Sequence, residues 1–452
     1  MRRLLPAAAL VAALLLAAAP AAPAPLPPGW AVTLSYRSPA DEVERFYDLR
    51  IPATWDGTSI LPAILFLHGR GGTKRQFERT EHYAEADARG VVLVFWEGRR
   101  VSASGGIPST FYVDGTNGVP DETDILACLD DALARAPIDP DRVALAGFSQ
   151  GGRGALGVGL LNPTRFAALI DGAGPTDAFQ GQLWVPSFTD FVSAAGGMPS
   201  AGGEVLARWF ELSPRFLLPN ARNLFVAVLH GQADDSVPDS TAFFPYRNGH
   251  HVSVTPGFTD TRGTRPTLSE LRANDPAGYA FTTWFPADVG HEQLRLLPPG
   301  VLFDAALGKV RPAHPARVVG VSFGSRERTF HWARLARTSA PDGTRALLDA
   351  RADVAANRVD LAFEGTVRIR LDLPAAGLDA ARSLSLRLSG GTRLDLALAG
   401  PFAPALAATL DGAPVVFERT TEGALLSALV PHPSGSLLVF SPAPAGPVAA
   451  TD

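Results

Sequence analysis

Short apolar runs alternate with helical patterns between about Trp30 and Pro299. The runs are rich in β-branched and aromatic residues, and they comprise Ala63–Leu67, Val91–Trp96, Val143–Ala146, Phe166–Ile170 and Leu224–Leu229. Strands that alternate with helices are typical of a mostly parallel sheet covered by helices on both faces. The pattern therefore predicts an α/β domain over residues 31–300.

The period of the apolar positions changes to two beyond about Arg311. Val359, Leu361 and Phe363 alternate with polar residues, and the same alternation runs from Val367 to Leu373. Alternation of this kind is typical of strands that bury one face and expose the other. It predicts a small, antiparallel, all-β domain of sandwich-like type over residues 311–440.

Two turn sequences predict hairpins inside this β domain. Ser389-Gly390-Gly391-Thr392 lies between the alternating runs 384–388 and 394–398, and Asp411-Gly412 precedes Val415. Glycine and aspartate accept the positive φ angles that tight hairpin turns require. We therefore expect antiparallel pairing across each of these turns.

One connection in the α/β domain is unusually long, because residues 175–222 separate two predicted strands. It carries many large apolar side chains, namely Phe179, Trp184, Phe188, Phe191, Met198, Trp209, Phe210 and Phe216. Connections of this length are uncommon in compact domains and are often functional. Two interpretations stay open: extra helices that pack their aromatic side chains inward, and a mobile lid.

The N-terminus has the three parts of a secretory signal peptide. Arg2 and Arg3 are followed by an apolar run to about Ala19 and then by small residues, which predicts cleavage near Ala22 or Ala24. We therefore expect a signal peptide over residues 1–24 and a secreted or periplasmic protein, with an uncleaved anchor as the alternative. No later stretch is apolar enough to predict a membrane span in the mature chain.

The net charge and the cysteine content argue against nucleic-acid partners and exclude internal disulfides. The formal charge of −5 becomes −7 once Arg2 and Arg3 are removed, which argues against nucleic acid as a partner because such binding depends on basic patches. Cys128 is the single cysteine, so no internal disulfide can form. It lies among apolar residues at helical spacing, which predicts a buried structural thiol.

The pentapeptide Gly147-Phe148-Ser149-Gln150-Gly151 fits the pattern G-x-S-x-G. An apolar strand precedes it and a helix-compatible stretch follows, so Ser149 falls at a strand-to-helix junction. A nucleophilic serine there sits on a tight, strained turn, and small flanking residues are needed because a Cβ at either side would clash. Ser149 is therefore the candidate nucleophile.

A glycine-rich turn upstream offers an oxyanion site. His68-Gly69-Arg70-Gly71-Gly72 directly follows an apolar strand. We expect the backbone N–H groups of Arg70 and Gln150 to face a developing oxyanion. The competing phosphate-loop pattern G-x-x-x-x-G-K-[ST] is not satisfied. We expect His68 to brace this loop.

Two candidate acids, either of which could orient a catalytic histidine, follow a later predicted strand. Leu229-His230-Gly231-Gln232-Ala233-Asp234-Asp235 places two carboxylates at the sheet edge where catalytic groups gather in open α/β sheets. Asp234 is the candidate, with Asp235 as the fallback. The alternative is that both residues only cap a helix that starts near Val237.

Position in the chain selects the base from nine histidines. Six lie in the β domain, in the oxyanion or acid loops, or in a helix ahead of the serine: His314, His331, His432, His68, His230 and His82. His250 and His251 follow Asp234 too soon to leave room for a helix and a last strand. His291 follows both a helical stretch, 268–274, and a strand, 279–285, so it is the candidate base.

Metal chemistry has little support in the sequence. His291-Glu292 lacks the second histidine of H-E-x-x-H, and His250-His251 are sequential, so they do not share a helix face. No calcium loop or cysteine pair is present. We expect neither a metal ion nor another cofactor.

The motifs together resemble the α/β-hydrolase superfamily. Pro137 to Gly152 is similar to the same region of secreted esterases related to prolyl oligopeptidase and to polyhydroxybutyrate depolymerases, and Arg317 to Ala333 resembles a β-rich tail of some of these hydrolases. The resemblance implies that Ser149 is the nucleophile, His291 the base and then the acid, and Asp234 the residue that fixes the His291 tautomer. It implies oxyanion donors at Gln150 and Arg70.

The sequence therefore predicts a secreted serine carboxylesterase that works through an acyl-enzyme, with polyesters and aromatic, feruloyl-type esters as candidate substrates. One alternative is a serine peptidase of prolyl oligopeptidase type. The other is a non-catalytic protein whose β domain holds a polymer or a glycan.

Overall fold

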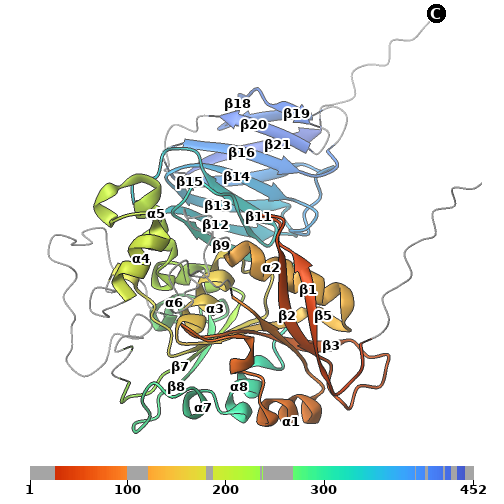
Figure 1. The fold of residues 1–452 in the computed structure, drawn as a ribbon. Helices are drawn as coiled ribbons and strands as arrows, with labels where there is room; N and C mark the ends of the chain where they lie inside the picture. Colours follow the sequence, from red (N-terminus) through yellow and green to blue (C-terminus); the bar gives the residue numbers. More distant parts are fainter. Residues whose placement is uncertain are drawn as a thin grey trace, which may run out of the picture.

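The fold was analysed in a computed structural model of the chain, shown in Figure 1. The structure describes residues 26–98, 121–179, 187–234, 237, 268–391, 393–402, 406–420, 423–428 and 435–442. The predicted signal peptide, residues 1–24, lies outside the described residues, as do Asp235, His250, His251 and most of the helix expected near Val237.

The α/β domain is built on one eight-stranded sheet with the strand order β1-β2-β4-β3-β5-β6-β7-β8. Strand β2 runs antiparallel to its neighbours β1 and β4, and β3 to β8 run parallel to one another. This is the mostly parallel sheet that the sequence predicts. Its strands are β1 Ala31–Arg37, β2 Glu44–Arg50, β3 Leu61–Leu67, β4 Val92–Trp96, β5 Ile138–Phe148, β6 Ala168–Gly172, β7 Phe225–Leu229 and β8 Ala280–Trp284.

Helices cover both faces of this sheet, because its central strands are apolar on both sides. Helices α1 (Thr80–Arg89), α7 (Gln293–Leu296) and α8 (Pro299–Ala306) pack on one face. Helices α2 (Asp121–Arg135) and α3 (Gln150–Leu161) pack on the other. In Figure 1 the β domain lies on the side of α2 and α3. Cys128 is a buried residue of α2, as expected, and burial raises the pKa of its thiol.

The long connection forms helices that pack inward. Its elements are α4 (Ser187–Ala195), η3 (Pro199–Ala201), α5 (Gly203–Glu211), η4 (Pro214–Phe216) and η5 (Leu218–Ala221). The rings of Phe179, Trp209 and Phe210 are buried. Phe323 of the β domain stacks on Phe210, with ring centroids 4.5 Å apart. The buried aromatic side chains of the connection thus belong to the core, whereas Met198 is exposed and Trp184 lies outside the described residues.

The β domain is a sandwich of two sheets. One has the order β10-β11-β14-β16-β20-β19 and the other β18-β17-β21-β15-β13-β12-β9, and one apolar core lies between them. The strands are β9 Arg317–Ser322, β10 Arg328–Phe330, β11 Ala333–Arg337, β12 Ala346–Asp353, β13 Arg358–Glu364, β14 Thr366–Asp372, β15 Leu384–Gly390, β16 Arg393–Ala399, β17 Leu406–Leu410, β18 Ala413–Pro414, β19 Glu418–Thr420, β20 Gly423–Ala428 and β21 Ser436–Pro442. The alternating burial of β12 to β14 confirms the predicted period of two.

One of the two hairpin predictions is confirmed and the other is wrong. Asp411 and Gly412 have φ angles of 51° and 83° and join β17 to β18 in an antiparallel pair. By contrast, β15 and β16 enter opposite sheets, where each pairs in parallel with an earlier strand. The turn at Gly390-Gly391 therefore crosses the sandwich. The domain is otherwise antiparallel, as expected.

Each strand predicted in the α/β domain differs from the structure at one or both ends, all but one by no more than two residues. The strand expected at 143–146 extends over Ile138–Phe148, because Ile138 also pairs with Leu61 of β3, across an irregularity in the register. The strand expected at 166–170 begins at Ala168. Among the described residues, no helix is both long and apolar enough to cross a lipid bilayer.

Candidate active site

Ser149 occupies a strained turn between β5 and α3. Its φ and ψ angles are 57° and −121°, a conformation that residues other than glycine rarely adopt. Its backbone N–H donates to the carbonyl oxygen of Gly172 at 2.7 Å, and its carbonyl oxygen accepts from the N–H of Arg153. The turn is thus held on both sides while the hydroxyl projects from the end of the sheet.

The turn requires glycine at its flanking positions, because neighbouring backbone atoms occupy the space that a Cβ would need. A Cβ on Gly147 would lie 2.1 Å from the carbonyl oxygen of Gly151. A Cβ on Gly151 would lie 2.2 Å from the carbonyl oxygen of Leu67, at the end of β3. The close approach of β3, β5 and α3 therefore explains the small residues on both sides of Ser149.

Ser149, His291 and Asp234 form a hydrogen-bonded chain. His291 Nε2 lies 2.8 Å from Ser149 Oγ, and His291 Nδ1 lies 2.7 Å from Asp234 Oδ2. Because a carboxylate only accepts, Nδ1 carries the ring hydrogen and Nε2 is left to accept the serine proton. The ring of Phe148 lies against His291, with centroids 4.8 Å apart. The structure thus brings together the three residues selected from the sequence.

The loops that carry Asp234 and His291 are joined to each other. They follow the adjacent parallel strands β7 and β8, and the N–H groups of Gln232 and Ala233 donate to the carbonyl oxygens of Pro286 and Val289. A Cβ on Gly231 would lie 2.1 Å from the Val289 carbonyl oxygen. This backbone pairing sets the distance between acid and base.

Asp234 is buried, yet it is held as a carboxylate. Burial alone would raise its pKa, but hydrogen bonds from His291 and from the Val237 N–H lower the pKa of Asp234 below its usual value. His230 Nε2 lies 3.5 Å from Asp234 Oδ2 and donates to the carbonyl oxygen of Val237. His230 therefore supports the acid loop.

The glycine-rich turn after β3 lies beside the serine. A Cβ on Gly69 would lie 3.5 Å from Ser149 Cβ, and Arg70 comes next in the chain. Gln150 is the first residue of α3 and follows Ser149 directly. Both candidate oxyanion donors thus belong to segments that flank the nucleophile.

His68 braces this turn, as expected. Its Nε2 accepts from the Gly98 N–H at 3.0 Å, so Nδ1 carries the hydrogen and donates to the Gly69 carbonyl oxygen at 2.9 Å. Burial lowers the pKa of His68, which keeps the imidazole neutral. The histidine expected in a helix before the serine, His82, is buried in α1 beside Phe77.

Gln76 makes a contact with this turn that the sequence analysis missed. The Gly69 N–H donates to Gln76 Oε1 at 2.6 Å, and the Gln76 carbonyl oxygen accepts from Gln293 Nε2. The local sequence Lys74-Arg75-Gln76 is an ordinary polar loop, so no pattern could have indicated it.

A second missed residue, Asp171, lies buried beneath the nucleophile turn. It is on β6 opposite Gly147, and its Oδ1 accepts from the Gly174 N–H at 2.7 Å. Among the described residues, its Oδ2 has no hydrogen-bond partner. Burial raises the pKa of Asp171 to about 8, so the carboxyl is mostly protonated at neutral pH.

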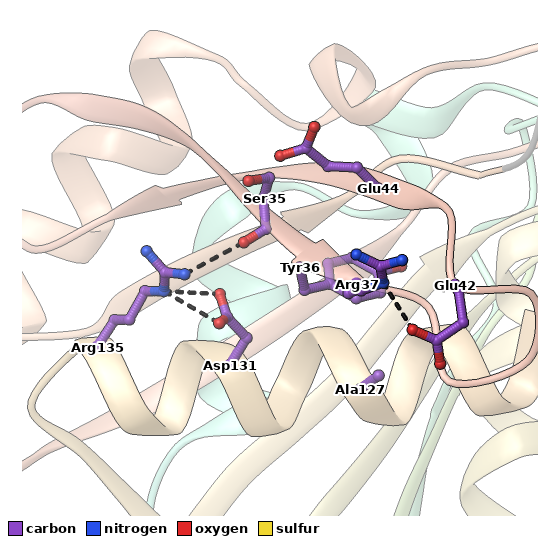
Figure 2. Close-up of a pocket in the computed structure, with 8 residues that line it drawn as sticks. All are labelled: Ser35, Tyr36, Arg37, Glu42, Glu44, Ala127, Asp131 and Arg135. Carbon is purple, nitrogen blue, oxygen red and sulfur yellow. Dashed lines mark hydrogen bonds and ion pairs between the residues drawn. The ribbon is translucent and has the colours of Figure 1, made fainter.

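A separate polar cleft of about 570 Å³ lies between the β1–β2 hairpin and α2, and Figure 2 shows the residues that line it. Arg135 pairs with Asp131 and donates to the Ser35 carbonyl oxygen, while Arg37 pairs with Glu42. Sites for small organic ligands are mostly apolar. Since its lining is largely charged and internally paired, this cleft is not the candidate site. The described residues include no cluster suited to holding a metal ion.

Comparison with known proteins agrees with this geometry. Residues 77–245 match the model of the prolyl oligopeptidase family, which is less than half of the chain. Over that range the chain is similar to prolyl oligopeptidases. A protein of Nocardia uniformis subsp. tsuyamanensis that is named as an esterase, NocK, is 33% identical over 125 residues, which cover 25% of this chain and only 33% of NocK.

Similar solved structures are more distant in sequence. An S-formylglutathione hydrolase from Agrobacterium tumefaciens is 16% identical, with a TM-score of 0.46 over 61% of this chain and 93% of its own. An acylaminoacyl peptidase from Pyrococcus horikoshii is 15% identical, with a TM-score of 0.44 over 62% of this chain and 42% of its own. The assignment of the fold therefore rests on the strand order and the elbow of the hydrolase domain itself.

Proposed function

We propose that the protein is a serine hydrolase that cleaves carboxylic esters through an acyl-enzyme. The observation that carries the proposal is the hydrogen-bonded chain from Ser149 Oγ through His291 to Asp234. The strained serine turn, the hydrogen bond between His291 Nδ1 and Asp234, and the similarity to an esterase support the proposal. Export after removal of residues 1–24 is part of the proposal, and N-terminal sequencing of the mature protein tests it.

The reaction proceeds in two halves. Ser149 Oγ attacks the ester carbonyl carbon and passes its proton to His291 Nε2, while Asp234 stabilises the resulting imidazolium. The imidazolium then protonates the alcohol as the carbon–alkoxy bond breaks, which leaves an acyl-serine. Water next gives a proton to His291 and attacks the acyl carbon; the bond from that carbon to Ser149 Oγ then breaks, Oγ takes the proton back from His291, and the acid leaves. The N–H groups of Gln150 and Arg70 stabilise each oxyanion.

Covalent labelling tests this proposal directly. A fluorophosphonate probe should form an adduct on Ser149 of the purified mature protein, located by mass spectrometry. The adduct should disappear in Ser149→Ala and fall strongly in His291→Ala. Labelling at another serine, or ester turnover that survives Ser149→Ala, would contradict the mechanism.

Peptide cleavage is the second candidate, because the family match over residues 77–245 is to prolyl oligopeptidases. A peptidase must protonate an amine leaving group, whereas an esterase releases an alcohol. We therefore propose comparing kcat/KM for a short acyl ester, a feruloyl ester and an aminoacyl anilide. A preference for the anilide would reverse the ranking.

A further inference from the structure

The turn that carries the candidate oxyanion donor Arg70 is fixed at the preceding residue, Gly69. Both polar atoms of Gly69 are engaged: its N–H donates to Gln76 Oε1 at 2.6 Å, and its carbonyl oxygen accepts from His68 Nδ1 and from the Gly72 N–H at 2.9 and 3.0 Å. The two peptide units on either side of Gly69 are therefore held by side chains. Glycine is the residue with the widest backbone freedom, so an unheld Gly69 would let the turn rotate.

The peptide geometry relates these bonds to Arg70. The Gly69 carbonyl and the Arg70 N–H belong to one planar trans peptide unit, so they point in opposite directions. Because the carbonyl is held toward His68 and Gly72, the Arg70 N–H is directed away from them. The peptide unit before Gly69, which carries the Gly69 N–H, is held by Gln76.

Small rotations at Gly69 matter because of its distance from the nucleophile. A Cβ placed on Gly69 would lie 3.3 Å from the Phe148 carbonyl oxygen and 3.5 Å from Ser149 Cβ. An oxyanion donor contributes most when it is already aimed at the position the charged oxygen will occupy. By holding the His68–Gly69 peptide, Gln76 limits rotation at Gly69 and therefore affects how the Arg70 N–H is oriented relative to Ser149.

Gln76 is itself held in place and reaches the other half of the site. It ends the short helix η1 (Lys74–Gln76), where its N–H donates to the Thr73 carbonyl oxygen. Its own carbonyl oxygen accepts from Gln293 Nε2 at 3.3 Å, two residues after His291. Gly72 leaves room for the amide, since a Cβ there would lie 2.9 Å from Gln76 Oε1.

We propose that Gln76 is a positioning residue: it fixes the His68–Gly69 peptide, from which the Gly69–Arg70 peptide extends, and thereby helps to aim the Arg70 N–H at the reacting carbonyl oxygen. The proposal rests on the ester hydrolase function proposed above. Gln76 acts through Gly69, whereas its backbone carbonyl joins the same turn to the His291 segment. Its side chain should therefore affect the transition state more than substrate binding.

Three variants test this role. Gln76→Met keeps the length of the side chain but removes the accepting oxygen, and Gln76→Glu keeps an accepting oxygen. Gln293→Met is the matched control, because it removes the bond to the Gln76 backbone but leaves the Gln76–Gly69 bond. For each we would measure kcat and KM on a short acyl ester, inhibition by an alkyl boronic acid, the melting temperature, and hydrogen exchange at the Gly69 amide.

We expect Gln76→Met to lower kcat about 10- to 100-fold, below the roughly 100- to 1,000-fold of a lost donor, with KM changed less than about threefold. Affinity for the boronic acid, whose adduct carries the oxyanion charge, should fall in parallel, and Gly69 should exchange faster. Gln76→Glu should restore Gly69 protection and bring kcat above that of Gln76→Met. Gln293→Met should lower kcat less than Gln76→Met does.

One result that would overturn the proposal is an unchanged kcat in Gln76→Met despite faster exchange at Gly69. Another is a KM that rises as much as kcat falls. A wild-type protein that neither labels at Ser149 nor hydrolyses esters would overturn the proposed function, and this proposal with it. An active wild type with unaffected Gln76→Met would overturn this proposal alone.

Discussion

His291 Nε2 lies 2.8 Å from Ser149 Oγ although 142 residues separate them in the chain. The two residues meet because the serine follows β5 and the histidine follows β8, and parallel strands present their carboxyl ends at one edge of the sheet. The loops of β7 and β8 are joined by backbone hydrogen bonds, so Asp234 arrives at the same place. Parallel topology thus assembles the site from three distant segments.

Asp234 should matter through the tautomer of His291. In Asp234→Asn the amide can donate to Nδ1, which moves the ring hydrogen to Nε2 and removes the acceptor for the serine proton. We expect kcat to fall on the order of 10⁴-fold with the fold retained. Asp288→Asn is the matched control, because Asp288 lies in the His291 loop but is 83% exposed. A loss of less than tenfold in Asp234→Asn would contradict the assignment.

The glycine after Gln150 should tolerate no side chain. The Cβ of Gly151→Ala would lie 2.2 Å from the Leu67 carbonyl oxygen and 2.6 Å from that of His68, and these are backbone atoms of β3 and its loop. We expect a loss of about 3 kcal/mol in the free energy of unfolding and strongly reduced labelling of Ser149. The measurement is chemical denaturation alongside probe labelling.

Gly300→Ala provides the control for that substitution. Gly300 lies in α8, and a Cβ there would meet open space. Alanine is favoured over glycine in a helix by roughly 0.5–1 kcal/mol, so this variant should be at least as stable as wild type. Equal destabilisation by both variants would show that the crowding near Ser149 is not the cause.

Asp171 should make stability depend on pH in an unusual direction. Its pKa is about 8 in the folded protein against 3.8 for the free side chain, so the folded state holds a proton that the unfolded state has released between these values. This contribution to stability is fully present below pH 3.8 and is lost as the pH rises to about 8. Asp171→Asn, which stays neutral, should therefore gain stability over wild type as the pH rises.

Melting temperatures of both proteins between pH 5 and 9 check this prediction. The difference between Asp171→Asn and wild type should widen toward pH 8 and then level off. A constant difference would mean that Asp171 is ionised in the folded protein throughout.

The β domain should be required for the stability of the hydrolase domain. Arg328 of β10 pairs with Glu122 of α2, and both side chains are buried. Burial alone would raise the pKa of Glu122, but Arg328 and then Arg326 lower it below its usual value. Glu211 of α5 lies 3.5 Å from Arg328 and, because of its burial, has a raised pKa.

Removing the Arg328 charge would leave Glu122 buried without its main partner. We expect Arg328→Met to lower the free energy of unfolding by about 3–5 kcal/mol. Arg326→Met is the control: Arg326 is half exposed and lies 3.6 Å from Glu122, so its loss should cost no more than about 1 kcal/mol. Similar effects from the two variants would show that Glu122 does not depend on Arg328.

The glycine pattern around Ser149 was predictable because its cause is local. A serine between strand and helix leaves no room for a Cβ on Gly147 or Gly151, so the motif and the geometry require each other. The order of the acid and the base was also predictable, because a parallel sheet places each loop at one edge. The catalytic roles themselves stay predictions until Ser149 is labelled.

The path of the chain through the β sandwich was not predictable. Gly390 and Gly391 have φ angles of 85° and 74°, which a hairpin turn also accepts. Strands β15 and β16 would bury the same alternating residues in either of two arrangements. They could pair with each other in one sheet, or they could face each other across the core from opposite sheets. Local turn chemistry and period therefore leave both arrangements open, and pairing with β13 and β14 decides between them.

Local sequence patterns indicated the strands of the α/β domain, the strained serine turn and the candidate residues, because periodicity and steric limits act over a few residues. Three contacts became visible only in the folded chain: the Gln76–Gly69 bond, the burial of Asp171 beneath Ser149 and the Arg328–Glu122 pair. Those contacts join side chains with no local pattern, and the last spans 206 residues. Their formation depends on how the sheet, the long connection and the β domain pack together.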